Sequence, residues 1–498
     1  MSQPPEPSQP PKASAGSGGE SDVLADRRNK LERIRAAGVD PFPHGFAGIE
    51  SVASVRAAHV GLVAGEETSA SHRVAGRLAA RRGQGKMAFL DLVDRSGRLQ
   101  LQARLDELGA ERMAALLEFD LGELIGVEGV AFSSRSGELS LRVTDYTLLA
   151  KSLRPPPDKH HGLADVETRY RQRELDLIAS EEARELFITR ARVISAIRAY
   201  LDGQGFIEVE TPMLQPLYGG AAARPFTTQH NALGRELYLR IATELYLKRL
   251  IVGGLERVYE IGKQFRNEGV DTTHNPEFTT IEYYEAYADY LDVAARFEAL
   301  VAFVADAIGY GGPFDFHAPW KRETLAGAIE SRTGILLGEH CDRDSLASAM
   351  RGIGIEPKDS DSWPQLVDEL LSKRVEPTLE APTLLLDYPV ALSPLAKRHR
   401  SEDGLVERFE AFVSGMEIAN AFTELNDPDD QRERFIEQQR YAADGDEEAQ
   451  PYDEAFVQAL EHGMPPTGGI GIGIDRLVML LTGKTSIREV VLFPAMRD

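Results

Sequence analysis

Cysteine is almost absent from this chain of 498 residues, in which Cys341 is the only one. A lone cysteine forms no internal disulfide and provides no cysteine cluster for zinc, and the neighbouring His340 does not change this. No apolar run approaches the roughly 20 residues that a membrane helix needs. The N-terminus also lacks the basic and then apolar segments of a secretory signal. We therefore expect a cytoplasmic protein without a membrane segment.

Positive charge is also scarce. The chain has 56 Lys and Arg against 79 Asp and Glu, which gives a formal net charge of −23. This balance argues against a protein that coats nucleic acid, but it leaves room for a local basic surface on an acidic body. The length predicts two or three domains.

The two familiar glycine motifs of nucleotide-binding folds are incomplete. TGKTS (482–486) contains a GKT triplet, but Val478 stands where a P-loop needs glycine. In GGIGIGIDR (468–476), Ile474 or Arg476 stands where the third Rossmann glycine should be. Both folds are therefore disfavoured.

Composition divides the chain into segments. Residues 1–20 are rich in Pro, Ser and Gly and predict a disordered tail. A basic helix that starts at Ser21 or Asp22 follows, and its charged face could contact RNA or only solvent. Three prolines at 155–157 predict a linker. The predicted domains are a tail over 1–20, a helix and barrel over 21–152, a linker over 153–180, and a large domain over 181–498 with a helical insertion near 311–395.

Residues 72–150 predict a small barrel. Five strand-like runs, with a helical stretch near 105–116 between the third and the fourth, follow the order of an OB fold, which binds oligonucleotides. Basic residues gather there, namely Arg73, Arg77, Arg81, Arg82, Lys86, Arg95, Arg98 and Arg104. Phe89 lies in one of these strands, where it could stack on unpaired bases or belong to the barrel core.

Residues 257–287 predict two antiparallel strands joined by a loop over 269–276. A period of two places one polar and aromatic set on the same face of the second strand: Phe278, Thr280, Glu282 and Tyr284. It groups Gln264, Arg266 and Glu268 on the first. Such a face suits a polar ligand, although a solvent-exposed face is the alternative.

Residues 408–428 predict a hairpin with a turn at Ser414-Gly415. This register places Glu410 and Glu417 on one face, where they could share Mg²⁺ with phosphate oxygens or could simply be solvated. It sends Asn420 and Glu424 to the other face. A single pocket for all four would need a bulge or a curved sheet.

Residues 467–481 (TGGIGIGIDRLVMLL) alternate glycine with Ile470, Ile472 and Ile474. The pattern predicts a strand with one bare face, which allows close approach of a flat group, and one apolar face. Arg476 follows at the junction with a helix, where its guanidinium could stack on a purine and stabilise phosphate.

These segments resemble the signature motifs of class II aminoacyl-tRNA synthetases. The first motif is GFIEVETPML (205–214) with Pro212, the second is FRNEG with HNPEFT, and the third is GIGIDRLVMLL. Four further stretches are similar to the lysine family: GGAAARPF (219–226), LYLRIATELYLKRLIVGGLERVYEIG (237–262), EIANAFTELNDP (417–428) and IREVVLFPAMR near the end. The resemblance covers nearly all of the chain from about residue 24. One departure is Thr243, where that family usually has proline before the glutamate.

The resemblance implies an α+β protein with an N-terminal OB-fold barrel and a class II catalytic domain built on an antiparallel sheet flanked by helices. It implies a lysine–tRNA ligase that uses ATP and Mg²⁺, charges tRNA(Lys) and forms a homodimer through its first motif. An aspartate or asparagine ligase is disfavoured by Glu282. A protein lysine ligase would lack the barrel, and an inactive RNA-binding paralogue would have lost Arg266, Arg476 or the acidic pair.

The resemblance also assigns roles to single residues. The catalytic residues would be Arg266 and Arg476. ATP would be bound by these two and by Glu268, His274, Phe278 and Glu417, and Mg²⁺ by Glu410 and Glu417. L-Lysine would be bound by Gly220, Glu244, Glu282, Tyr284, Asn420 and Glu424. The central anticodon uridine would be read by Arg82, Phe89 and Gln100.

Overall fold

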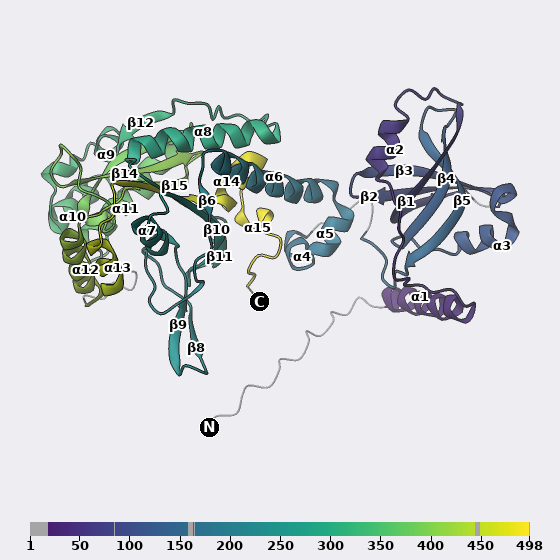
Figure 1. Cartoon of the computed structure of the whole chain (residues 1–498), viewed down its shortest axis with the longest axis horizontal. Helices are drawn as coiled ribbons and strands as arrows, with labels where there is room; N and C mark the ends of the chain where they lie inside the picture. The colour runs from purple at the N-terminus through teal and green to yellow at the C-terminus, as the bar shows by residue number, and fades with distance from the viewer. Residues whose placement is uncertain (1–17, 84, 158–162, 164, 444–448, 498) are drawn as a thin grey trace. The chain divides into compact units, whose positions relative to one another are not determined.

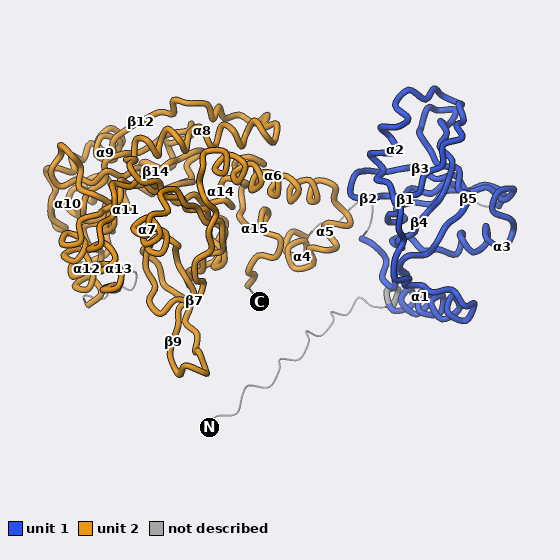
Figure 2. The backbone as a smooth tube through the Cα atoms, viewed as in Figure 1, with its two compact units in different colours: residues 1–163 blue, residues 164–498 orange. Residues whose placement is uncertain are grey.

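The computed structural model describes residues 18–83, 85–157, 163, 165–443 and 449–497, and the chain divides into two compact units, 1–163 and 164–498 (Figure 2). Residues 1–17 of the predicted tail lie outside the described residues. Residues 18–20 differ from that prediction, because they begin helix α1 (Gly18–Ala36).

Unit 1 contains the predicted OB barrel. Its strands are β1 (Glu67–Arg82), β2 (Met87–Asp94), β3 (Gly97–Arg104), β4 (Leu124–Ser133) and β5 (Leu139–Ala150), and α3 (Leu105–Leu117) lies between the third and the fourth. They close in the order β1-β2-β3-β5-β4, and β1 pairs with β4. Alternate residues such as Leu90, Leu101 and Val127 fill the interior, and Val52 and Val55 of α2 (Val52–Ala58) join this core. The five-stranded prediction is confirmed.

Unit 2 is built on a long, mainly antiparallel sheet (Figure 1). Within the described residues its order is β12 (Lys321–Thr324), β13 (Thr383–Pro389), β14 (Leu405–Val413), β15 (Met416–Thr423), β16 (Thr467–Gly473), β11 (Glu277–Ala286), β10 (Arg257–Phe265) and β6 (Ile207–Glu208). Among the strand pairs of this sheet in the described part of the chain, β12–β13 and β6–β10 are parallel and the others are antiparallel. The predicted α+β class with an antiparallel sheet is confirmed.

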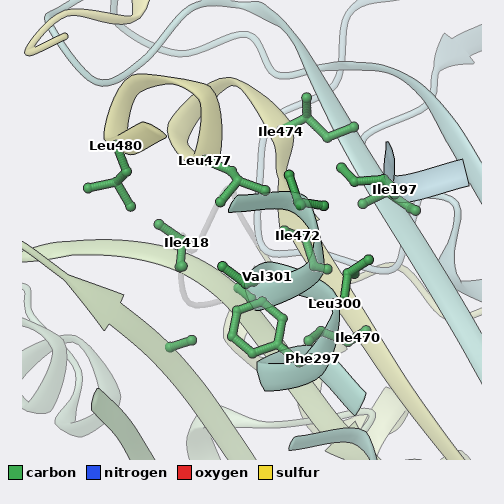
Figure 3. Packing of buried hydrophobic residues seen from close by; sticks show 14 of the residues in the cluster. Ile197, Phe297, Leu300, Val301, Ile418, Ile470, Ile472, Ile474, Leu477 and Leu480 are labelled. Carbon is green, nitrogen blue, oxygen red and sulfur yellow. The ribbon is translucent and has the colours of Figure 1, made fainter. Parts of the chain in front are cut away.

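One face of this sheet is covered by helices. The apolar side chains of β16 pack against α6 (Glu181–Gly203), α8 (Tyr290–Ile308) and α14 (Ile474–Thr482). Figure 3 shows Ile470 and Ile472 of β16 in this layer with Ile197, Phe297 and Leu477. The alternation of β16 thus directs its isoleucines into the core, and its bare side faces the opposite way.

Further helices and a small sheet border the opposite face. Three helices pack together there: α7 (Glu244–Val252), α12 (Pro428–Ala443) and α13 (Glu454–Glu461). They contribute Leu247, Phe435 and Phe456, respectively, to a common core. The small sheet has the order β7 (Leu214–Gln215), β9 (Arg235–Leu239), β8 (Thr227–His230), and its β8–β9 hairpin projects from unit 2 in Figure 1. A short helix, α15 (Ile487–Val490), follows α14.

The segment predicted as a helical insertion near 311–395 has helices and a core of its own. It includes α9 (Leu325–Thr333), α10 (Arg343–Gly352), α11 (Trp363–Leu370) and the short turns η1 (Leu337–Glu339), η2 (Leu371–Val375), η3 (Glu376–Thr378) and η4 (Val390–Leu392). It also contains β12 and β13, which extend the main sheet. The insertion is therefore not purely helical.

The predicted linker over 153–180 contains regular structure in its second half. Two helices lie there, α4 (Val166–Arg171) and α5 (Arg173–Ala179), while residues 158–162 and 164 lie outside the described part. Arg173 is buried, forms a 2.8 Å ion pair with Asp176 and donates to the carbonyl oxygens of Arg488 and Leu492. These bonds hold α5 against the end of unit 2.

In the described portion of the chain, no helix combines the length and the apolar composition that crossing a membrane requires.

Candidate active site

The two strands predicted over 257–287 form the β10–β11 hairpin. Their register pairs Glu260 with Glu282 and Val258 with Tyr284. The even-numbered residues of β11 from Phe278 to Tyr284 line a cavity, whereas Ile281 and Tyr283 between them are buried in the core on the other face. The predicted polar face of this hairpin therefore lines a cavity in the structure.

The glycine strand β16 lies between β11 and β15. Gly471 is opposite both Glu282 and Asn420, and Gly469 is opposite Tyr284. A Cβ at Gly469 would overlap Glu424 Oε1 and the Tyr284 ring, whereas a Cβ at Gly471 would lie 3.6 Å from Glu282 Cγ. The bare face of β16 thus makes room for side chains of the neighbouring strands.

The hairpin β14–β15 corrects the predicted register. Glu410 pairs with Asn420, and a register shift after Ala411 then pairs Phe412 with Glu417. Directly opposed residues in an antiparallel pair point to the same face. The bulge therefore places Glu410, Glu417 and Asn420 on one face, and the prediction that Asn420 and Glu424 point away from the acidic pair is wrong.

All these elements surround one cavity of about 890 Å³. Its lining includes every residue expected to bind ATP, namely Arg266, Glu268, His274, Phe278, Glu417 and Arg476. It also includes every residue expected to bind lysine, namely Gly220, Glu244, Glu282, Tyr284, Asn420 and Glu424. The insertion contributes further lining from residues 360–368. The structure thus brings the twelve residues together, and the two arginines and five glutamates among them give the cavity regions of opposite charge.

Arg266 carries the positive charge next to β11. Its guanidinium carbon lies 5.1 Å from the centre of the Phe278 ring, and its Nε is buried without a hydrogen-bond partner among the described residues. Burial lowers the pKa of Arg266 from its ordinary value, although arginine keeps its charge. A buried donor of this kind suits an anionic ligand such as a phosphate.

Arg476 is positioned by the start of α14. The preceding residue, Asp475, is buried, and its Oδ1 forms a 2.6 Å ion pair with Nη1 of Arg190 on α6. Its Oδ2 accepts a 2.7 Å hydrogen bond from the backbone nitrogen of Thr279. Arg476 itself donates to the carbonyl oxygen of Glu417 at 2.8 Å and forms a 3.0 Å ion pair with its carboxylate. The arginine is therefore directed at Glu417, the acidic residue of β15.

Glu410 shares a face of the hairpin with Glu417, but it is buried and is not among the residues that line the cavity. The Tyr388 hydroxyl donates to it at 2.8 Å, and Arg408 pairs with its other oxygen. Burial raises the pKa of Glu410, attraction to Arg408 opposes the increase and repulsion from Glu417 adds to it.

Glu376 of η3 lies beside the turn of this hairpin, where a Cβ at Gly415 would be 3.2 Å from its carbonyl oxygen, and burial with repulsion from Glu410 and Glu417 raises the pKa of its side chain to about 7. No group of three or more Asp, Glu, His or Cys side chains among the described residues could hold a metal ion, so a Mg²⁺ at Glu410 and Glu417 would need phosphate oxygens for the rest of its shell.

The opposite part of the cavity is lined by buried carboxylates. Glu282 Oε1 accepts a 3.1 Å hydrogen bond from the backbone nitrogen of Thr243, which a proline could not donate, and Oε2 accepts a 3.3 Å bond from Tyr284. Burial and then repulsion from Glu244 raise the pKa of Glu282 to about 7. Burial raises the pKa of Glu424 to about 8. These groups would be stabilised by a cationic ligand.

Gly220 lies beside this acidic region. Its φ of +89° is a conformation that favours glycine, and a Cβ there would lie 3.0 Å from the Cβ atoms of Ala242 and Glu244. A side chain at residue 220 would therefore crowd Ala242 and Glu244.

Three charged residues near the cavity were not predicted. Lys248 is bound to Glu244 and Glu424, Arg408 is bound to Glu410, and Glu376 comes from the insertion. The spacing of four between Glu244 and Lys248 was a usable signal, because it is the spacing of helical ion pairs. The sequence held no comparable signal for Glu376, whose place depends on how the insertion folds.

The barrel of unit 1 carries the other predicted site. Arg82 of β1 is opposite Phe89 of β2, and Gln100 of β3 is opposite Asp91 of β2. Phe89 and Asp91 are two residues apart on β2 and point to the same face, so the four side chains share that face. Phe89 is only half-buried and lies between the buried Ala88 and Leu90, which excludes it from the barrel core. Arg82 and Arg98 both pair with Asp91, at 3.1 and 3.3 Å. The outer face thus offers an aromatic ring beside two arginines.

Comparisons with known proteins agree with both units. Residues 165–497 match the family of tRNA synthetases class II (D, K and N), and residues 72–149 match the OB-fold nucleic acid binding domain. The chain is 52% identical to the lysine–tRNA ligase of Chloroflexus aurantiacus over 96% of its length and 99% of that protein. It is 50% and 49% identical to the lysine–tRNA ligases of Moorella thermoacetica and Bacillus subtilis, over 96% of its length and 98% of each relative. The chain belongs to the lysine–tRNA ligase family of the class II tRNA synthetases.

Proposed function

We propose that this chain activates L-lysine with ATP to form lysyl-adenylate and transfers the lysyl group to the 3′ end of tRNA(Lys) in the cytoplasm. The observation that carries the proposal is the charge arrangement in one cavity: Glu282 and Glu424 are buried in one part, and Arg266 and Arg476 lie in another. A molecule with an ammonium group at one end and a carboxylate that reacts with a phosphate at the other fits this arrangement.

In the first step, the lysine carboxylate attacks the α-phosphate of ATP and pyrophosphate leaves. Arg266 would bind the α-phosphate and the lysine carboxylate, and Phe278 would support the adenine ring. Arg476 would bind the γ-phosphate and stack on adenine, with Glu268 and His274 as further ATP contacts. Glu410 and Glu417 would hold Mg²⁺, which neutralises phosphate charge when it is bound. The remaining catalysis comes from positioning and from fixed charges in a partly buried site.

Selectivity for lysine would come from charge. Glu244, Glu282 and Glu424 would receive the substrate's ammonium group, with Gly220, Tyr284 and Asn420 shaping the site. An aspartate side chain would be repelled by the same carboxylates, and an uncharged one would leave the buried Glu282 without a cationic partner. This favours lysine over the related aspartate and asparagine.

Unit 1 would bind the anticodon. Phe89 would stack on a base, and Arg82 and Gln100 would read the central uridine beside it. The barrel also separates this proposal from a protein lysine ligase, which would lack it.

A homodimer is also proposed. Ile207, Met213 and Leu214 of the first motif are 48–49% exposed in the isolated chain. Apolar groups gathered in this way suit an interface with a second copy. Light scattering after gel filtration should give twice the chain mass, and a monomer would contradict the dimer.

The decisive experiment is an amino-acid panel. ATP–pyrophosphate exchange is measured with each amino acid, followed by charging of tRNA(Lys) with the preferred one. We expect exchange with lysine and little with aspartate or asparagine. Exchange that does not depend on lysine would refute the proposed substrate, and exchange with lysine without charging of tRNA would favour a protein lysine ligase.

A further inference from the structure

Lys248 is a buried lysine without a part in the proposed reaction. It lies on α7, one helical turn after Glu244, and is 0% exposed. Its Nζ lies 6.0 Å from the centre of the Phe456 ring on α13. Burial of an ammonium group is costly unless carboxylates compensate it, so the groups around Lys248 indicate what its position achieves.

Two of the carboxylates proposed to receive the substrate hold this ammonium group. Lys248 Nζ lies 2.5 Å from Glu244 Oε1 and 2.5 Å from Glu424 Oε2. Glu244 begins α7, whereas Glu424 follows β15 in the central sheet. Lys248 therefore connects the helix to the sheet at the acidic part of the cavity.

One oxygen of this cluster remains open to a ligand. Glu424 Oε1 is buried and has no hydrogen-bond partner within the described residues. Both Glu424 and Glu244 line the cavity, whereas Lys248 approaches them from the protein side and is not part of the lining. The substrate's ammonium group would thus meet carboxylates that already have a fixed position.

The charges that face Lys248 are Glu244 of α7 and Glu424 after β15. Glu282 and the Tyr284 hydroxyl on β11 act on these two carboxylates in turn. Burial and repulsion from Glu244 and Glu282 raise the pKa of Glu424, and attraction to Lys248 opposes that increase. Without the lysine charge, Glu424 would bind a proton at a higher pH.

We propose that Lys248 is a positioning residue of the amino-acid pocket: its ammonium group holds Glu244 and Glu424 in place and favours the ionised form of Glu424 for the ammonium group of the substrate. The inference rests on the proposed function, because it takes these carboxylates as the lysine site. A purely structural link between α7 and the sheet would affect unfolding but not the pH dependence of lysine binding.

The test is Lys248→Met, which keeps the length of the side chain and removes its charge. ATP–pyrophosphate exchange without tRNA is measured against lysine concentration between about pH 6 and pH 9. At neutral pH we expect the KM for lysine to rise by about tenfold or more, and the acidic limb of kcat/KM to move up by about one pH unit. The kcat at saturating lysine and high pH should change by less than about threefold, since the phosphate-binding residues are untouched.

Lys151 provides a matched control. It is a buried lysine of unit 1 that pairs with Asp120 at 2.5 Å and with Glu123. Lys151→Met should lower the thermal stability of unit 1 and leave the KM for lysine and its pH profile unchanged. A folded Lys248→Met variant with the profile of the native chain would overturn the proposal.

Two further measurements apply if Lys248→Met does not fold. Lys248→Gln keeps a hydrogen-bond donor without the charge and should show the same shifts in KM and pH limb. If it also fails, ¹⁵N-lysine NMR of the native chain should show a shielded ammonium signal that moves when L-lysine is added, and a signal that does not move would overturn the inference. Absence of lysine-dependent exchange in the native chain would instead refute the proposed function.

Discussion

Burial shifts the pKa values of single side chains in this cavity. In an unfolded, solvated chain Arg266 and Glu282 would have ordinary pKa values. In the fold, burial lowers the pKa of Arg266 and raises the pKa of Glu282 to about 7. Each group is then stabilised by a ligand of opposite charge. At the scale of the residue, chemistry therefore depends on which charges the fold removes from water and where it leaves them.

Arg266→Ala should nearly abolish adenylate formation. The change removes the buried cation proposed to bind the α-phosphate, and loss of one such donor reduces kcat by about 10²–10³-fold. ATP–pyrophosphate exchange measures the loss, and filter binding should show that tRNA affinity is largely kept. Lys263→Ala, which removes a partly exposed cation of the same hairpin, is the control. Normal activation by Arg266→Ala would contradict the assigned role.

Lysine affinity should fall as the pH drops below about 7. The pKa of Glu282 is raised to about 7, so the free site takes up a proton there, and a protonated carboxyl attracts an ammonium group less well. Calorimetric titration with lysine at a series of pH values measures this dependence. Glu282→Gln should weaken binding by about 10–100-fold at high pH and flatten the dependence.

Glu285→Gln is the matched control for that titration. Glu285 is buried on the opposite face of the same strand and pairs with Arg296 at 2.8 Å. Its variant should keep the pH dependence of the native chain. Equal effects of the two variants would show that Glu282 has no special role.

At the scale of the element, alternation predicted the strands well. The period of two on β11 and β16 assigned their polar, bare and apolar faces as the structure has them. The hairpin β14–β15 was predicted with its turn at Ser414-Gly415, but the bulge after Ala411 was not placed. A bulge depends on pairing with the neighbouring strands, which the local sequence of one hairpin does not contain.

The two glycines on the bare face of β16 should differ in how well they tolerate a methyl group. Gly469→Ala places a methyl group against Glu424 and Tyr284, so it should lower stability by about 1–3 kcal/mol and raise the KM for lysine. Gly471→Ala has 3.6 Å to the nearest atom and should change stability by less than about 0.5 kcal/mol. Thermal unfolding compares the two. Equal stability of both variants would show that close packing at Gly469 is unimportant.

At the scale of the whole molecule, we expect unit 1 to bind the anticodon and unit 2 to activate lysine. Phe89→Ala removes the ring proposed to stack on an anticodon base, a contact of about 1–3 kcal/mol, so the KM for tRNA should rise by about 5–150-fold. Lysine activation without tRNA should be unchanged, because the cavity lies in unit 2. Charging and exchange assays separate the two effects. Val60→Ala, which trims a side chain that is 86% exposed in unit 1, should affect neither.

The sequence by itself determined the five strands of the barrel with a helix between the third and the fourth and the polar face of β11, because periodicity is a property of the chain. The resemblance of its long motifs to a known family supplied the residues of the cavity. The sequence also held the Glu244 and Lys248 spacing of a helical ion pair. Only the tertiary structure decided that Lys248 also contacts Glu424, that Glu376 lies beside Gly415 in the β14–β15 turn, and that β12 and β13 of the insertion extend the main sheet. These contacts join segments far apart in the chain, and their energies depend on burial, which exists only once the chain has folded.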